Sequence, residues 1–152
     1  MRISQPNITI EDRDEFPIAA VEITNMPDIQ LDQAIEIRSH MLERGLPSHI
    51  PYFLLLSPDS GFLWKGGRLS DMDSPPDLQF PMDTVMAQYS KKPPEQRLYT
   101  GQLEYLFARW LIDLKTQPQA MVEELEKKLM HVGFTDAIHH AAILITGDRE
   151  TL

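Results

Sequence analysis

The sequence predicts a single α/β domain over its 152 residues, and three observations support that prediction. Residues 7–10 alternate polar and apolar side chains, which is strand periodicity, and residues 17–24, PIAAVEIT, are predicted as a second strand with Pro17 at its first position, where a missing N–H is tolerated. Residues 51–57, PYFLLLS, form a short continuous apolar run, which is typical of a strand buried inside a sheet. Residues 102–116 repeat large apolar side chains at helical spacing. Together these segments predict a mixed sheet flanked by helices, with a helical C-terminal half.

The N-terminal half is predicted to contain a hairpin, a helix and two more strands. The charged turn EDRDEF joins the first two strands, so they form an antiparallel hairpin. A helix over 28–44 follows, with Asp28 as its N-cap and Gly45 just beyond its last turn. The apolar face of this helix is expected to comprise Leu31, Ala34, Ile35, Met41 and Leu42. Residues 51–57 and 61–66 are then two strands joined by the turn PDSG.

A proline-rich arm is predicted over 66–100, with a short helix near 82–89. Its prolines include Pro75, Pro76, Pro81, Pro93 and Pro94. The arm divides the single domain 1–152 into a core over 1–65 and a C-terminal part over 101–152.

The C-terminal part is predicted to hold two helices and a last strand. The stripe of helix 102–116 consists of Leu103, Leu106, Phe107, Trp110, Leu111 and Leu114. A second helix over about 118–132 begins at a proline and ends before Gly133. Residues 141–146, AAILIT, are expected to form the closing strand.

Composition narrows the class of protein. The formal net charge is −9, and a protein that binds nucleic acid normally needs a basic face, so nucleic acid is disfavoured as a partner. The chain has no cysteine, which excludes disulfides, cysteine-bound zinc and a cysteine nucleophile. No apolar run approaches the roughly 18–20 residues of a membrane span, and MRISQPNITI does not look like a signal peptide. We therefore expect a cytoplasmic protein without a membrane partner.

A polar group gathers at the end of the second strand. Glu22 and Thr24 are expected on the same face, because side chains alternate along a strand. Ile23 points to the other face but leaves its carbonyl beside them. An acid, a carbonyl and a third polar group two residues on are parts of a magnesium-dependent phosphodiesterase site.

The order of PN, EIT, a helix and PYFLLLSPDSGFLWKG resembles the PD-(D/E)XK nuclease superfamily, in particular its small stand-alone members. The resemblance covers residues 5–65 and implies a restriction-endonuclease-like mixed sheet. In active members an Asp follows the Pro of one strand, and an acid, any residue and a Lys follow on the next strand. The two acids and the middle carbonyl hold the metal, while the Lys positions the attacking water.

The chain departs from this pattern at two positions. Asn7 stands where the Asp is expected and Thr24 stands where the Lys is expected, while Glu22 is retained. Asn brings no charge to a magnesium ion, and Thr cannot stabilise a developing phosphorane with an ammonium group. We therefore expect Asn7, Glu22 and Thr24 to be a vestigial site, without catalysis and without a cofactor.

Three interpretations of this site stay open at the level of sequence. The first is a catalytically degenerate nuclease-like domain that acts as a binding or scaffolding module rather than as an enzyme. The second is a magnesium-dependent nuclease with a migrated or composite site, in which Glu22 is a metal ligand. The third is an edge hairpin whose polar residues are simply solvated.

The expected partner is a second copy of the chain or another protein. Active relatives have a helix and a strand before the strand that matches 7–10, so an unpaired sheet edge is predicted here, and such edges invite pairing. Helix 102–116 also carries more large apolar groups than one sheet face needs, and Met121 and Met130 lie beyond it. The alternative is a rearranged monomer in which strand 141–146 covers that edge.

Overall fold

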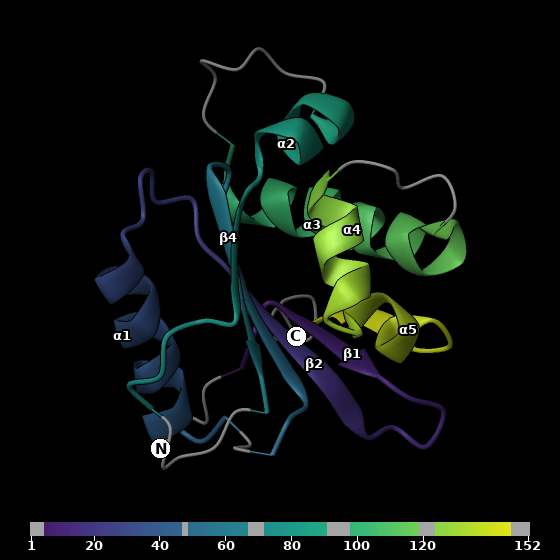
Figure 1. Cartoon of the computed structure of the whole chain (residues 1–152), viewed down its shortest axis with the longest axis horizontal. Helices are drawn as coiled ribbons and strands as arrows, with labels where there is room; N and C mark the ends of the chain where they lie inside the picture. The colour runs from purple at the N-terminus through teal and green to yellow at the C-terminus, as the bar shows by residue number, and fades with distance from the viewer. Residues whose placement is uncertain (1–4, 47–48, 67–71, 91–97, 119–123, 147–152) are drawn as a thin grey trace.

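A computed structural model describes residues 5–46, 49–66, 72–90, 98–118 and 124–146 (Figure 1). The described residues form one α/β unit with a six-stranded mixed sheet and five helices. The strands are β1 (Ile8–Glu11), β2 (Pro17–Ile23), β3 (Tyr52–Leu56), β4 (Ser60–Lys65), β5 (Leu78–Pro81) and β6 (Ala142–Ile145). The helices are α1 (Leu31–Glu43), α2 (Asp83–Tyr89), α3 (Thr100–Thr116), α4 (Glu124–His131) and α5 (Phe134–Ile138).

The sheet order is β5-β4-β3-β2-β1-β6. Only β2 and β3 pair in parallel, because α1 crosses between them and returns the chain to the same end of the sheet. All other neighbouring strands are antiparallel. The last strand therefore pairs with the first, and Ile8 lies opposite Ile145.

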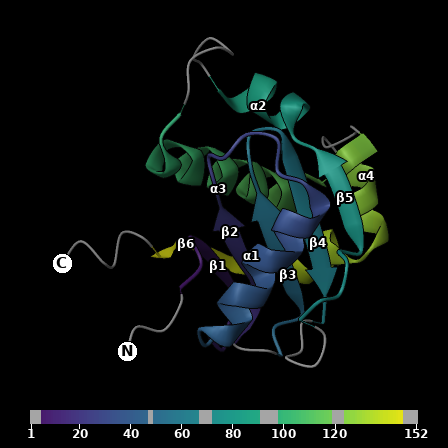
Figure 2. The same cartoon turned by 90° about the vertical axis from the view of Figure 1, so that its left-hand side faces the viewer.

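Each face of the sheet has its own apolar core. The larger core joins the sheet to the helices after residue 82 and includes Ile8, Val21 and Leu54 together with Phe107 and Trp110. The smaller core lies under α1 and contains residues of β2, β3 and β4, but none of β1 or β6. Figure 2 shows α1 alone on its side of the sheet, with α3 and α4 on the other side. The β1–β6 part of the sheet thus has a helical layer on one face only.

Helix α1 begins and packs differently from the sequence prediction. Its N-cap is Gln30, whose N–H donates to the Gln33 side chain at 2.8 Å, while Asp28 lies outside the helix with φ 53°. Leu31, expected on the apolar face, is 43% exposed. The buried anchor is Arg38, which is 2% exposed and lies 5.4 Å from the Trp64 ring. The sequence pattern counts arginine as a polar residue, so this position was not recognised as core. Its aliphatic stem can nevertheless pack against apolar surface.

The strands and helices predicted from the sequence are present, but two elements were missed. Strand β5 lies inside the predicted arm and extends the sheet, and α5 follows α4 directly after Gly133. Residues 67–71 and 91–97 of the arm lie outside the described residues, as do residues 119–123 of the helix predicted over 118–132. Helix α2 matches the short helix expected near 82–89.

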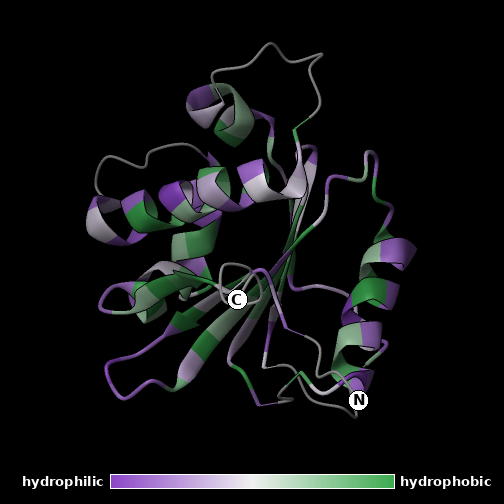
Figure 3. Ribbon diagram, turned by 180° about the vertical axis from the view of Figure 1, so that it is seen from behind, coloured by the Kyte–Doolittle hydropathy of each residue, from purple (hydrophilic) through white to green (hydrophobic). Residues whose placement is uncertain are grey.

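The dimer was predicted from an unpaired edge at the first strand and from an excess of apolar side chains on helix 102–116, and the structure shows neither feature as expected. The edge of β1 is covered by β6 of the same chain, which is the arrangement expected for a rearranged monomer. The α3 stripe is buried within the chain, except that Leu106 is only partly buried. Figure 3 shows hydrophilic and hydrophobic positions alternating along the outer surface of α3. Among the described residues, no helix is both long and apolar enough to cross a membrane.

Candidate functional site

Asn7 is held by hydrogen bonds on both sides of its amide group. It lies just before β1, and its Oδ1 accepts the backbone N–H of Ile23 at 2.7 Å. Its Nδ2 donates to Glu104 Oε2 at 2.9 Å. The side chain therefore ties β1 both to the last residue of β2 and to helix α3. An aspartate could not do this, because it would present acceptors to both partners.

Glu22 lies next to Asn7 and has an unusual protonation equilibrium. Burial raises the pKa of its carboxyl from 4.5 to about 7, since a charged carboxylate loses hydration there. A hydrogen bond from the backbone N–H of Asn7 lowers this pKa, and the charge of Glu104 raises it further. Near neutral pH the Glu22 carboxyl therefore exchanges between its protonated and ionised forms, whereas an ordinary glutamate is fully ionised.

Glu104 is the member of the site that sequence reasoning missed. It comes from α3, far from the hairpin in sequence, and is partly buried beside Asn7. Its neighbours Leu103 and Phe107 belong to the apolar stripe, and the helix alone gives no reason to single out one acid on its flank. The position of Glu104 depends on tertiary structure, since the pairing of β6 with β1 brings the C-terminal half against β1.

Thr24, which the sequence predicts on the same face as Glu22, forms its hydrogen bonds with Leu56 and Met26. It follows the last residue of β2, and its N–H donates to the carbonyl of Leu56 at 3.0 Å. Its hydroxyl Oγ1 accepts the backbone N–H of Met26 at 3.1 Å. This is a local turn contact of the kind that Ser and Thr make after a strand. The hydroxyl is therefore used to shape the loop that leads into α1.

A groove of about 480 Å³ runs from Glu22 along the flank of α1. Met26 also lines it, and the α1 side chains on its wall are Gln33, Glu36, Ile37, His40, Met41 and Arg44. Acidic and basic groups alternate with apolar ones, so the groove has neither a uniform basic charge nor a lysine. The described residues contain no group of three or more His, Asp or Glu side chains arranged to hold a metal ion.

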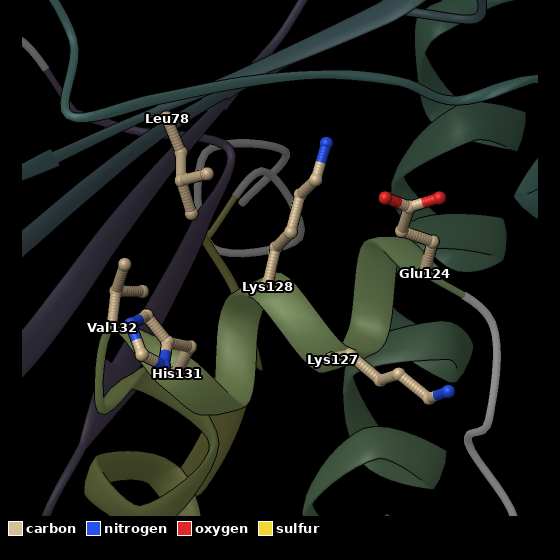
Figure 4. Close-up of a pocket in the computed structure, with 6 residues that line it drawn as sticks. All are labelled: Leu78, Glu124, Lys127, Lys128, His131 and Val132. Atoms are coloured by element: carbon tan, nitrogen blue, oxygen red, sulfur yellow. The ribbon is translucent and has the colours of Figure 1, made fainter.

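A second hollow lies on the opposite side of the sheet, between β5 and α4 (Figure 4). Its volume is about 450 Å³, and it is lined by Leu78, Glu124, Lys127, Lys128, His131 and Val132. Figure 4 shows Lys128 and Leu78 reaching into the same space from α4 and β5, while Lys127 points away. This cationic hollow contains none of the residues that the sequence singled out.

Comparison with known proteins identified no similar protein. No family model, no curated protein and no solved structure matches the chain. The function is therefore argued from the site itself.

Proposed function

We propose that the protein is a catalytically degenerate, PD-(D/E)XK-like domain that acts as a binding or scaffolding module. The observation that carries the proposal is the hydrogen bonding of Asn7. Both ends of its amide are engaged within the protein, at 2.7 Å and 2.9 Å. The position that supplies a metal-binding carboxylate in active relatives is here a structural link between β1, β2 and α3.

The remaining site residues support the same proposal. Burial raises the pKa of the Glu22 carboxyl to about 7, so a cation that binds there near neutral pH has to displace a proton, which weakens its apparent affinity. The Thr24 hydroxyl is used in a turn, and no lysine lines the groove beside Glu22. Among the described residues, the hairpin itself therefore contributes one acid to this site, Glu22, and neither the second acid nor the lysine of the family pattern.

The strand order supports the finer fold assignment, a restriction-endonuclease-like sheet. In active relatives a helix and a strand precede the strand that matches β1. Here β6 pairs with β1 on the side away from β2, and α3 packs over that part of the sheet. Strand β6 and helix α3 would thus occupy the place that an earlier strand and helix take in active members, as expected for a rearranged member of that fold.

The test is a cleavage and metal-binding experiment on the purified chain. Single- and double-stranded DNA and RNA are incubated with magnesium or manganese, and metal binding is measured by calorimetry. We expect no cleavage above a no-protein blank, and no metal binding tighter than about millimolar. Glu22-dependent binding at micromolar metal, lost in Glu22→Ala and retained in the exposed control Glu43→Ala, would contradict the proposal.

One observation favours the second candidate, a magnesium-dependent nuclease with a composite site. Glu104 approaches both Asn7 and Glu22, so the structure supplies a second acid that does not come from the hairpin. Two carboxylates and an amide oxygen are ligands that magnesium accepts, and the cofactor would then be Mg²⁺. Cleavage that disappears in both Glu22→Gln and Glu104→Gln would favour this candidate over the first.

The proposed partner of the module is a second copy of the chain or another protein. We place this function in the cytoplasm. The chain has no cysteine and so forms no disulfide, which is compatible with a reducing compartment. Nucleic acid stays disfavoured, because the groove beside Glu22 carries Glu36 as well as His40 and Arg44 and is not a basic surface.

A further inference from the structure

The sheet ends in two edge strands that differ in how they are protected. Strand β5 ends at Pro81, and the cationic side chains of α4 lie beside it (Figure 4). Proline and lysine are devices that proteins use to block pairing at an edge. Strand β6 is the four-residue sequence AILI, without a charge or a proline. Figure 2 shows β5 and β6 at opposite sides of the sheet.

The outward hydrogen-bonding groups of β6 can be assigned from its pairing with β1. Thr146 N–H donates to the carbonyl of Asn7 at 2.9 Å, so Thr146 faces β1. In an antiparallel ladder this direction alternates, so Leu144 and Ala142 also bond toward β1. The N–H and C=O groups of Ile143 and Ile145 therefore point away from the sheet. Among the described residues, no strand pairs with this edge.

The side chains of β6 are also incompletely covered. Ile143 and Ile145 are partly buried against the larger core, and Leu144 is partly buried on the other face. On that other face the α1 core contains no residue of β1 or β6, and Ala142 is exposed. An apolar strand with open backbone groups and half-covered side chains on both faces is a surface suited to another strand of the same kind.

We propose that a second copy of the chain pairs with β6, strand to strand and antiparallel, to form a continuous sheet across a two-fold axis. A two-fold axis makes two identical edge strands run antiparallel, and each copy then offers the same outward groups that it receives. The short apolar sequence is self-complementary in this arrangement, since isoleucine side chains of one copy lie beside those of the other on the α3 face. This inference rests on the self-association part of the proposed function and names its surface.

Charge identifies the kind of contact. Each chain carries a net charge of −9, so two copies repel one another at long range. An uncharged contact surface adds no local repulsion to this, and β6 carries no charge. Salt should therefore strengthen the dimer by screening the overall repulsion, whereas a contact based on ion pairs would weaken.

The experiment is sedimentation equilibrium over about 1 to 100 μM protein, the range in which a small interface dissociates. The wild-type chain is expected to reach twice its mass of 17.5 kDa, with tighter association when salt rises to about 0.3 M. Ile143→Pro removes one outward N–H donor without removing a bond to β1, and it should weaken association at least tenfold. Ile143→Val keeps the donor and should retain the dimer.

A second variant keeps the test decisive if Ile143→Pro does not fold. Ala142→Lys adds an edge lysine at an exposed position and should also yield a monomer. Ala87→Lys makes the same substitution at an exposed position of α2 and should leave the dimer intact. In the wild type, the amides of Ile143 and Ile145 should exchange slowly at high protein concentration and quickly after dilution.

Two results would overturn the inference. One is a wild-type chain that stays at 17.5 kDa throughout the concentration range. The other is a dimer that survives both Ile143→Pro and Ala142→Lys with fast exchange at residues 143 and 145. Neither result bears on the degenerate site, which the cleavage and calorimetry experiments test separately.

Discussion

Replacing Glu22 by glutamine should stabilise the folded protein, and the gain should depend on pH. Glutamine has nearly the shape of a protonated glutamate, and its Oε1 can accept the same backbone N–H of Asn7. The substitution removes a carboxylate that is costly to ionise beside Glu104. The variant therefore measures what the protein loses by keeping an acid at this position.

The size and sign of the effect follow from the shifted protonation of Glu22. Its pKa is about 7 in the folded protein against 4.5 as the ordinary value. As the pH rises through 4.5, the unfolded chain releases its proton while the folded protein still holds it, so the free energy of unfolding falls. The fall ends near pH 7, where the folded protein also ionises, and by then it amounts to about 3 kcal/mol. Stability from this group is fully present only below about pH 4.5.

The assay is urea unfolding followed by tryptophan fluorescence, because Trp64 and Trp110 are both buried. The free energy of unfolding is compared for wild type and Glu22→Gln at about pH 4.5, 6, 7 and 8. We expect near equality at the lowest pH and a gain of up to about 3 kcal/mol for the variant at pH 8. The control Glu43→Gln, at an exposed position of α1, should change stability by less than about 0.5 kcal/mol at every pH. A gain for Glu22→Gln that is the same at pH 4.5 and pH 8, or a loss at pH 8, would refute the reasoning.

Three further predictions concern the Asn7 hydrogen bonds, the packing at Gly61 and the restoration of the family pattern. Asn7→Ala should destabilise the fold by about 2 kcal/mol, since it removes two hydrogen bonds and leaves the Ile23 N–H unpaired; urea unfolding measures the loss, and a change below about 0.5 kcal/mol would contradict it. Gly61→Ala should also destabilise, by about 1–3 kcal/mol, because a Cβ there would lie 2.1 Å from the Phe80 ring. If the clash is the cause, Gly61→Ala should destabilise the Phe80→Leu variant less than it destabilises the wild type. Asn7→Asp combined with Thr24→Lys should restore metal affinity, measured by calorimetry, with little recovery of cleavage. Robust cleavage by that double variant would show that the acidic surface does not oppose nucleic-acid binding.

Periodicity was sufficient to predict most of the fold. The alternation in β1 and the apolar stripe of α3 are each one local pattern, and each element is present where that pattern lies. Strand β5 was missed because its four residues, LQFP, end in proline and lie among other chain breakers. Helix α5 was missed because Gly133, expected only to end α4, also begins the next helix with φ 86°. Short elements next to breakers depend on tertiary pairing, and no local pattern specifies that pairing.

The candidate site was predicted in part for the same reason. Asn7 and Glu22 do lie together, because the hairpin register that places them is local. Thr24 is one residue past the end of β2, and its hydroxyl accepts the Met26 N–H, a turn contact that strand alternation does not predict. Glu104 could not be found at all, since its approach depends on the pairing of the last strand with the first.

The amide at position 7 lets two acids, Glu22 and Glu104, lie close to the same side chain. With an aspartate there, Glu22, Glu104 and the new carboxylate would place three acids together at the end of β2, with no cation to compensate their charges. Asparagine removes one charge and also supplies a donor for Glu104, while its oxygen still accepts the Ile23 N–H. The same substitution that would remove a metal ligand thus gives two partly buried polar groups a hydrogen-bond partner. Glu22 is left as the destabilising member of the cluster, because burial and the charge of Glu104 raise its pKa more than the Asn7 hydrogen bond lowers it. The free energy of unfolding of the wild-type protein is therefore expected to depend on pH through this one carboxyl, whether or not the site binds a ligand.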